Sequence, residues 1–189
     1  YRRHARLDLL DAMFRIEQLE LGRTFLSSGL DIFIRIVPRI MRDALATIEP
    51  VAMLEIAHLY GSILKKVRAG SSPAEIADLD CEVLQAFAAS LDDPYVQLAV
   101  TSSTRLRRSL TTRFVAAIDA DAHYAAVLEL FQRYQAKTID LDAFETALRA
   151  HLVEVTEPLR RYFAELPSDP YLVAEILPQE HPGCSSVTA

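Results

Sequence analysis

The chain has 189 residues, a length that suits one domain with a sizeable core. Hydrophobic residues make up 51% of the chain and charged residues 24%, which excludes an intrinsically disordered protein. The formal net charge of −6 argues against a nucleic-acid-binding face in this chain, because such a face is rich in lysine and arginine.

The sequence shows no segment of the kind that enters a membrane or directs secretion. No apolar run approaches the roughly 18 residues of a membrane span. The basic start of the chain leads into an amphipathic pattern dotted with acids, unlike a secretory signal. The two cysteines, Cys81 and Cys184, are far apart, so a disulfide framework is not expected. We therefore expect a cytoplasmic protein without a membrane partner.

Apolar residues recur with a period near 3.6 along most of the chain, which predicts an all-α protein. The expected helices cover residues 7–27, 30–47, 50–69, 73 to the turn before Pro94, 94–118, 122–137 and 141–166. About seven helices with short connections predict an antiparallel helical bundle. Residues 167–189 hold four prolines and no sustained period, which is typical of a tail.

Glycine, proline and capping residues suggest where these helices begin and end. Gly29, after Ser28, is expected to end the first helix, because glycine adopts the left-handed conformation that stops a helix. Pro38 should kink or divide the second expected helix, and Pro158 should kink the last one. Helix starts are predicted where an N-cap residue or a proline opens an apolar pattern. These starts are Glu49-Pro50, Ser72-Pro73 with Glu75 in the first turn, Asp93-Pro94 and Asp140.

Three blocks of sequence carry a family resemblance. The first is the acidic helix and turn of residues 78–94, DLDCEVLQAFAASLDDP, and the second is TRLRRSL at 104–110. The third combines YAAVLELF at 124–131 with FETALRAHL at 144–152. In this order and spacing the blocks resemble the effector-binding FCD domain of FadR-type GntR transcription regulators, over about residues 9–163.

The resemblance implies a domain organisation and a function. Residues 1–6 would end a linker from a winged-helix DNA-binding domain that is absent from this chain. Residues 7–166 would form the helical effector-binding and dimerisation domain, followed by the tail at 167–189. The implied partners are a second copy of the chain, a small organic acid or acyl-CoA-like effector, and operator DNA contacted through the absent domain. No enzyme activity is expected, and the sequence contains no P-loop, HExxH or nucleophile-elbow motif.

Many members of this family hold a metal ion through one aspartate and three histidines. Asp80 and His151 match two of these ligands, whereas Leu84 and Tyr124 stand at the other two positions. His123 is one residue away, and a one-residue shift turns a side chain by about 100° around the helix. Two ligands of four do not hold a divalent ion tightly, so no cofactor is expected. In this respect the chain is similar to the acyl-CoA-responsive branch of the family.

The first helix departs from the family pattern as well. Family members often place an arginine there, facing the pocket, whereas this chain has Glu17 at that position and Arg15 two residues earlier.

Six residues are expected to contact the effector. They are Asp80, Leu84, Ser102, Arg105, Tyr124 and His151. Arg105 follows Leu98 by seven residues and Ser102 by three, which places it on the buried stripe of a continuous helix. A buried arginine needs an anionic partner, either a bound carboxylate or Asp80 across the bundle. Asp80, Tyr124 and His151 also have ordinary structural explanations, as a helix-dipole partner or as satisfied core residues. Cys81 lies beside acids, so little thiolate character is expected there.

Two other hypotheses remain open at this stage. One is a helical metal-dependent enzyme or metal-binding protein that uses Asp80, His123 and His151 on facing helices. The other is a TetR-type effector domain, which is also all-helical and dimeric and would dimerise through the last two long helices.

Overall fold

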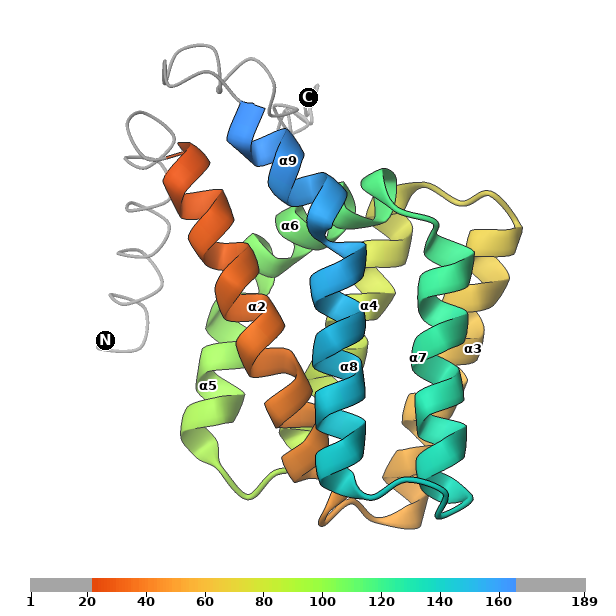
Figure 1. Cartoon of the computed structure of the whole chain (residues 1–189). Coiled ribbons are helices and arrows are strands. Elements are labelled where there is room, and N and C mark those ends of the chain that lie inside the picture. Colours follow the sequence, from red (N-terminus) through yellow and green to blue (C-terminus); the bar gives the residue numbers. More distant parts are fainter. Residues whose placement is uncertain (1–21, 166–189) are drawn as a thin grey trace, which may run out of the picture.

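The computed structural model describes residues 22–165 of the chain. Every regular element in this part is an α-helix, which confirms the predicted all-α bundle (Figure 1). No helix in residues 22–165 combines the length and the apolar character needed to cross a bilayer. The predictions for residues 1–21, including the linker, Arg15 and Glu17, lie outside the described residues, and so does the predicted tail.

Eight helices are described, against about seven expected. They are α2 (Gly22–Leu45), α3 (Pro50–Arg68), α4 (Pro73–Ala89), α5 (Pro94–Ser102), α6 (Thr104–Ala117), α7 (Ala120–Gln135), α8 (Leu141–Val155) and α9 (Glu157–Glu165). The buried helix α4 packs against α2, α3, α5 and α6. Helices α2 and α8 run side by side, and α7 lies between α8 and α3 (Figure 1).

Capping residues start several helices where the sequence predicts a start. Ser72 and Glu75 form a reciprocal capping box: the Glu75 amide donates to Ser72 Oγ at 3.3 Å, and the Ser72 amide donates to Glu75 Oε2 at 3.0 Å. Asp93 accepts the amide of Tyr95 at 2.9 Å, and Asp140 accepts that of Ala143 at 2.8 Å. These predicted starts are therefore confirmed.

The predicted stop at Gly29 is wrong, because α2 continues through it from Gly22 to Leu45. A Cβ atom added at Gly29 would lie 3.2 Å from Leu110 Cδ1 of α6. The glycine thus allows α2 and α6 to approach closely and does not end a helix. The helix also continues past Pro38, so the predicted division there does not occur.

Two helices predicted as continuous are divided. Residues 94–118 form α5 and α6, joined at Ser103, where the Val100 carbonyl accepts hydrogen bonds from the hydroxyls of Ser103 and Thr104, both at 3.2 Å. Such side-chain bonds compete with the backbone ladder. The helix predicted at 141–166 forms, as far as residue 165, the two helices α8 and α9, joined at Thr156 two residues before Pro158, which lacks the amide hydrogen that would continue the ladder.

An aromatic cluster packs between α3, α4, α7 and α8. The rings of Phe87 and Phe131 stack with centroids 5.6 Å apart, while Tyr60 and Phe144 approach Phe131 at 5.3 and 5.1 Å. Phe87 and Phe144 are fully buried. This cluster is part of the hydrophobic core.

Candidate functional site

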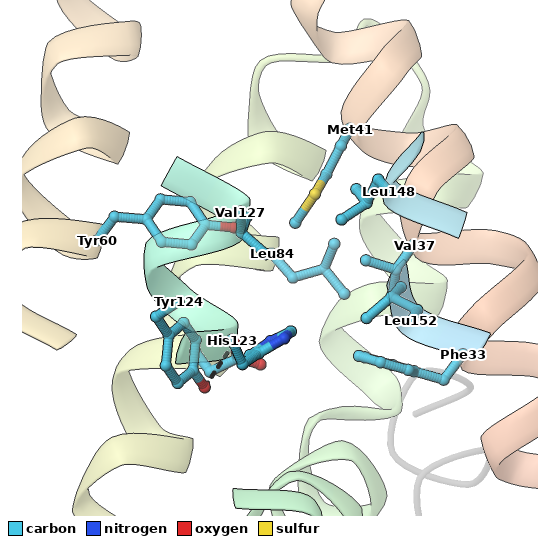
Figure 2. A pocket seen from close by; sticks show the side chains of 11 residues that line it. Phe33, Val37, Met41, Tyr60, Leu84, His123, Tyr124, Val127, Leu148 and Leu152 are labelled. Carbon is cyan, nitrogen blue, oxygen red and sulfur yellow. Dashed lines mark hydrogen bonds between the residues drawn. The ribbon is translucent and has the colours of Figure 1, made fainter. Parts of the chain in front are cut away.

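A small cavity lies inside the bundle, between α2, α3, α4, α7 and α8 (Figure 2). Its volume is about 30 Å³, enough for about two water molecules. The cavity is lined by Phe33, Val37, Met41, Tyr60, Asp80, Leu84, His123, Tyr124, Val127, Leu148 and Leu152. A ligand larger than a few atoms therefore requires the walls to move apart.

The cavity has a polar end and an apolar wall. Helices α3, α4 and α7 supply the polar side chains Tyr60, Asp80, His123 and Tyr124, whereas α2 and α8 supply only apolar ones. In Figure 2, Tyr124 and His123 lie together at one end, and Phe33, Val37 and Leu152 lie on the opposite side. An amphiphilic small molecule matches this distribution of polar and apolar groups.

Asp80 is the acidic group of the cavity. It lies one helical turn before Leu84 on α4, so both residues point to the same side. The Tyr124 hydroxyl donates to Asp80 Oδ1 at 3.2 Å. Burial raises the pKa of Asp80 to about 6, although this hydrogen bond and the nearby Arg107 charge act in the opposite direction. Burial also raises the pKa of Tyr60 and Tyr124 well above the usual tyrosine value, with the Asp80 charge adding to it.

His123 and His151 form a directly hydrogen-bonded pair. The distance between His123 Nδ1 and His151 Nε2 is 2.9 Å, and the two rings are nearly parallel with centroids 5.0 Å apart. Burial, helped by the neighbouring His151, lowers the pKa of His123 to about 3. Burial lowers the pKa of His151 as well. Near neutral pH both rings are therefore uncharged, with one donating to the other.

The expectation that Arg105 is buried is wrong, since Arg105 is exposed. The arginine that lies near this region is Arg107. The prediction assumed one continuous helix, and the break at Ser103 changes which side of α6 faces the core. The partly buried Arg107 donates through Nη2 to the Val100 carbonyl at 3.2 Å. Its Nε atom has no hydrogen-bond partner among the described residues. Arg107 influences Asp80 through its charge but does not line the cavity.

The other predicted residues divide between the cavity and its surroundings. Asp80, Leu84 and Tyr124 line the cavity. His151 does not line it but is hydrogen-bonded to His123, which does. Ser102 lies outside, with its hydroxyl donating to the Ala99 carbonyl at 3.3 Å.

Sequence reasoning missed Tyr60 and the apolar wall of α2 as site residues. Phe33, Val37 and Met41 repeat at four-residue spacing, a signal that indicates an inward face. That signal does not reveal which inward residues border a void.

The residues present do not fit the metal site of the resembled family. Within residues 22–165 no three His, Cys, Asp or Glu side chains are grouped so that they would hold a metal ion. His123 and His151 direct one nitrogen each at the other, and Asp80 is bonded to Tyr124. The hypothesis of a metal ion on Asp80, His123 and His151 therefore finds no support in this arrangement.

Cys81 does not provide a nucleophile at this site. The residue is buried, and burial raises the pKa of its thiol to about 11. The low thiolate character predicted from the sequence is thus confirmed.

Comparison with known proteins yields no matching family model, no matching curated protein and no matching solved structure.

Proposed function

We propose that this chain is the ligand-sensing and dimerisation domain of a FadR/GntR-type transcription regulator. The observation that carries the proposal is the small cavity with polar side chains on one side, lined from five helices of the bundle. The three sequence blocks of the resemblance support the family, because each contributes residues to this cavity or its surroundings. They supply Asp80 and Leu84, then Arg107, then Tyr124, Leu148 and Leu152.

The helix that would transmit binding is α2. Its residues Phe33, Val37 and Met41 form the apolar wall, and it directly follows residues 1–21 of the chain. In the resembled family the DNA-binding unit precedes the effector domain. A ligand that displaces α2 would therefore change the placement of the DNA-binding units and, by linkage, the affinity for operator DNA.

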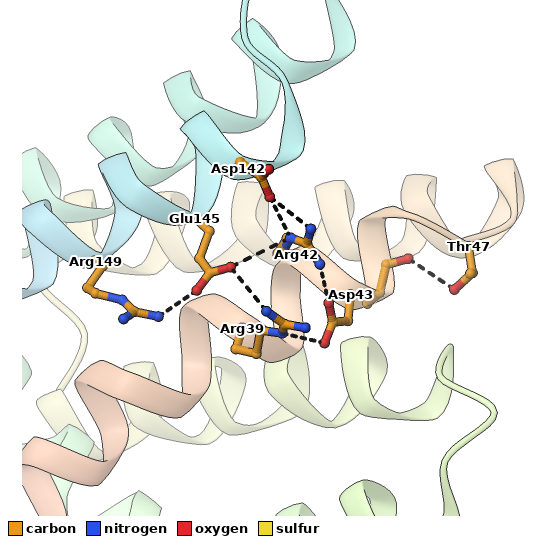
Figure 3. Close-up of polar contacts among 8 residues, drawn as sticks. Arg39, Arg42, Asp43, Thr47, Asp142, Glu145 and Arg149 are labelled. Atoms are coloured by element: carbon orange, nitrogen blue, oxygen red, sulfur yellow. Dashed lines mark hydrogen bonds and ion pairs between the residues drawn. The ribbon is translucent and has the colours of Figure 1, made fainter.

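Helix α2 is also held to α8 by a cluster of charged side chains, which we call the α2–α8 ion-pair cluster (Figure 3). It comprises Arg39, Arg42, Asp43, Asp142 and Glu145. Arg42 Nη2 lies 2.8 Å from Asp142 Oδ1, and Arg42 Nε lies 3.6 Å from Glu145 Oε2. Arg42 follows the cavity residue Met41 directly, and Glu145 precedes Leu148 by one turn. The cluster thus restrains the same two helices that must separate to admit a ligand.

Native mass spectrometry of the purified chain tests the proposal. We expect a homodimer that carries a small organic molecule, which is released on denaturation. Val127→Leu adds one methylene group to the cavity wall and should reduce the bound fraction, whereas Val115→Leu adds the same group at a buried site outside the cavity.

A monomeric chain, or a molecule retained equally by both variants, would contradict the proposal. So would an empty chain that no added amine, alcohol or carboxylic acid stabilises against thermal unfolding.

A further inference from the structure

Four polar side chains line the cavity. One of them, Asp80, accepts fewer hydrogen bonds from the protein than a carboxylate can accept. The Asp80 carboxylate accepts one side-chain hydrogen bond, from Tyr124, at 3.2 Å. An ionised carboxylate has room for about four. Asp80 forms no ion pair with any residue of the described segment. Asp80 is partly buried and borders the cavity, so its remaining acceptor positions are open to a donor in that space.

The Tyr60 hydroxyl is a second open position on the cavity wall. The residue is almost fully buried, and its hydroxyl makes no hydrogen bond to another side chain or carbonyl in residues 22–165. Tyr60 and Asp80 both line the cavity, and the charge of Asp80 raises the pKa of Tyr60. The Tyr60 oxygen, which accepts as well as donates, is therefore a second polar group that a ligand in the cavity can meet.

The described part of the chain brings no lysine or arginine to the cavity wall. Arg105 is exposed, and Arg107 directs its Nη2 to the Val100 carbonyl and to Thr104 Oγ1. The His123–His151 pair is uncharged near neutral pH, because burial lowers the pKa of both histidines. The nearest cation, Arg107, acts on Asp80 through its charge but does not line the cavity, so an anionic ligand would meet the Asp80 carboxylate with no cationic side chain among the described residues of the wall to bind it.

We propose that the cavity recognises an amine: a small cationic ligand whose ammonium group binds Asp80, with an alkyl or aryl part against α2 and α8. This inference rests on the proposed sensor function and changes the effector class from the organic acid that the family resemblance implies. The ammonium supplies the donors that Asp80 lacks, and its charge takes the place of an absent ion-pair partner. Phe33, Val37, Met41, Leu148 and Leu152 then contact the apolar part.

The test compares three probes that share a propyl or propanoyl skeleton: propylamine, propan-1-ol and propanoate. The reporter is the methyl signal of Met41, which lines the cavity, in protein labelled with ¹³C-methyl methionine. Met53, on α3 outside the cavity lining, serves as an internal reference. Met41→Leu identifies the reporter signal, and titrations at pH 7.5 and constant ionic strength give the dissociation constants.

We expect propylamine to shift the Met41 signal saturably and to bind more tightly than propan-1-ol, with propanoate weakest. Asp80→Asn should weaken propylamine binding about tenfold or more, since it replaces a charge-assisted hydrogen bond with a neutral one. The same variant should leave propan-1-ol binding nearly unchanged. The matched control is Asp78→Asn on the same helix, because Asp78 is exposed and pairs with Arg108. It should bind propylamine as the unmodified chain does.

The outcomes separate this inference from the function on which it rests. Propanoate or propan-1-ol binding more tightly than propylamine would overturn the amine and leave a ligand-binding cavity. Equal propylamine affinities in Asp80→Asn and the unmodified chain would also overturn the amine alone. No shift of Met41 with any of the three probes would overturn both. The comparison of probes on the unmodified chain remains decisive even if Asp80→Asn fails to fold.

Discussion

His123 illustrates how burial controls charge at a single residue. Its ring is enclosed by Phe114, Tyr124 and His151, with the Phe114 ring edge-on at 5.0 Å. Because burial lowers the pKa of His123 to about 3, the unfolded chain binds a proton at this histidine where the folded chain does not. The folded state therefore loses stability as the pH falls below 6.5, the ordinary value for histidine. Asp80 acts in the opposite direction, since its raised pKa favours the protonated folded state between pH 6 and 3.8.

Replacing His123 by phenylalanine should remove most of this acid sensitivity. We expect the free energy of unfolding to fall between pH 7 and pH 5 by about 2 kcal/mol less in His123→Phe than in the unmodified chain. Asp80 is present in both proteins, so its opposite contribution cancels in the comparison. Urea denaturation at the two pH values provides the measurement. The control is His58→Gln, because His58 is exposed, and this variant should retain the pH dependence of the unmodified chain. If His123→Phe loses as much stability between pH 7 and pH 5 as the unmodified chain, the assignment is refuted.

At the scale of single elements, a glycine inside α3 and a glycine just after its C-cap have opposite roles. Gly61 lies within α3 on an exposed face, with no atom within 4 Å of an added Cβ. Gly70 follows the C-cap Ala69 with φ +71°, and the amides of Gly70 and Ser71 donate to the carbonyls of Val67 and Lys66. This is the left-handed Schellman termination, in which a side chain is strained.

Alanine substitution should therefore change stability in opposite directions at the two sites. Gly61→Ala should raise the free energy of unfolding by about 0.5–1 kcal/mol, because it lowers the entropy of the unfolded chain at no steric cost. Gly70→Ala should lower it by about 1 kcal/mol, because alanine disfavours the left-handed conformation. Thermal and urea unfolding of the two variants provide the measurement, and equal signs would contradict the explanation.

The pairing of α2 with α8 is also a property of elements. Arg42 contacts Asp43 of its own helix and Asp142 and Glu145 of α8, and the Glu145 side chain is only 16% exposed. Arg42→Gln should loosen this pairing while leaving the apolar core intact. Surface ion pairs contribute little to the free energy of global unfolding. We therefore expect the substitution to increase local opening of the two helices rather than global unfolding.

Hydrogen–deuterium exchange of Arg42→Gln measures that local opening. We expect severalfold faster exchange in the C-terminal half of α2 and the first turns of α8, with propylamine binding unchanged or tighter. Arg161→Gln, which breaks the exposed pair with Glu157 in α9, should leave both segments unaffected. Faster exchange spread evenly over all helices would instead indicate general destabilisation.

At the scale of the whole molecule, the cavity is the place where five helices meet without complete packing. Leu148 and Leu159 are both 1% exposed, yet only Leu148 lines the cavity. Substituting either residue by alanine removes the same buried groups. The two variants therefore separate the cost of lost packing from the effect of a wider cavity.

Each alanine variant should lower the free energy of unfolding by about 3 kcal/mol. Only Leu148→Ala should tighten propylamine binding, because it enlarges the cavity and reduces the wall movement that binding requires. Urea denaturation and the Met41 titration measure the two quantities. If Leu159→Ala tightens binding to the same extent, general loosening of the bundle is the cause and the cavity argument fails.

The sequence alone determined the helical class and most helix starts. Apolar periodicity and helix caps depend on residues within one or two turns, so they can be recognised without knowing what packs nearby. Examples of such caps are Ser72 with Glu75 and Asp93 with Pro94. Asp80, Leu84 and Tyr124 also line the cavity, and they were selected because they stand at the metal-ligand positions of the resembled family.

Only the tertiary structure decided the features that depend on neighbours distant in sequence. Gly29 continues a helix because Leu110 of α6 lies against it, and Arg105 faces outward because the break at Ser103 sets the phase of α6. The His123–His151 hydrogen bond joins residues 28 positions apart on two helices. Local patterns report which side of a helix is buried, whereas the partner on that side, and any space left between partners, follow from the packing of the whole bundle.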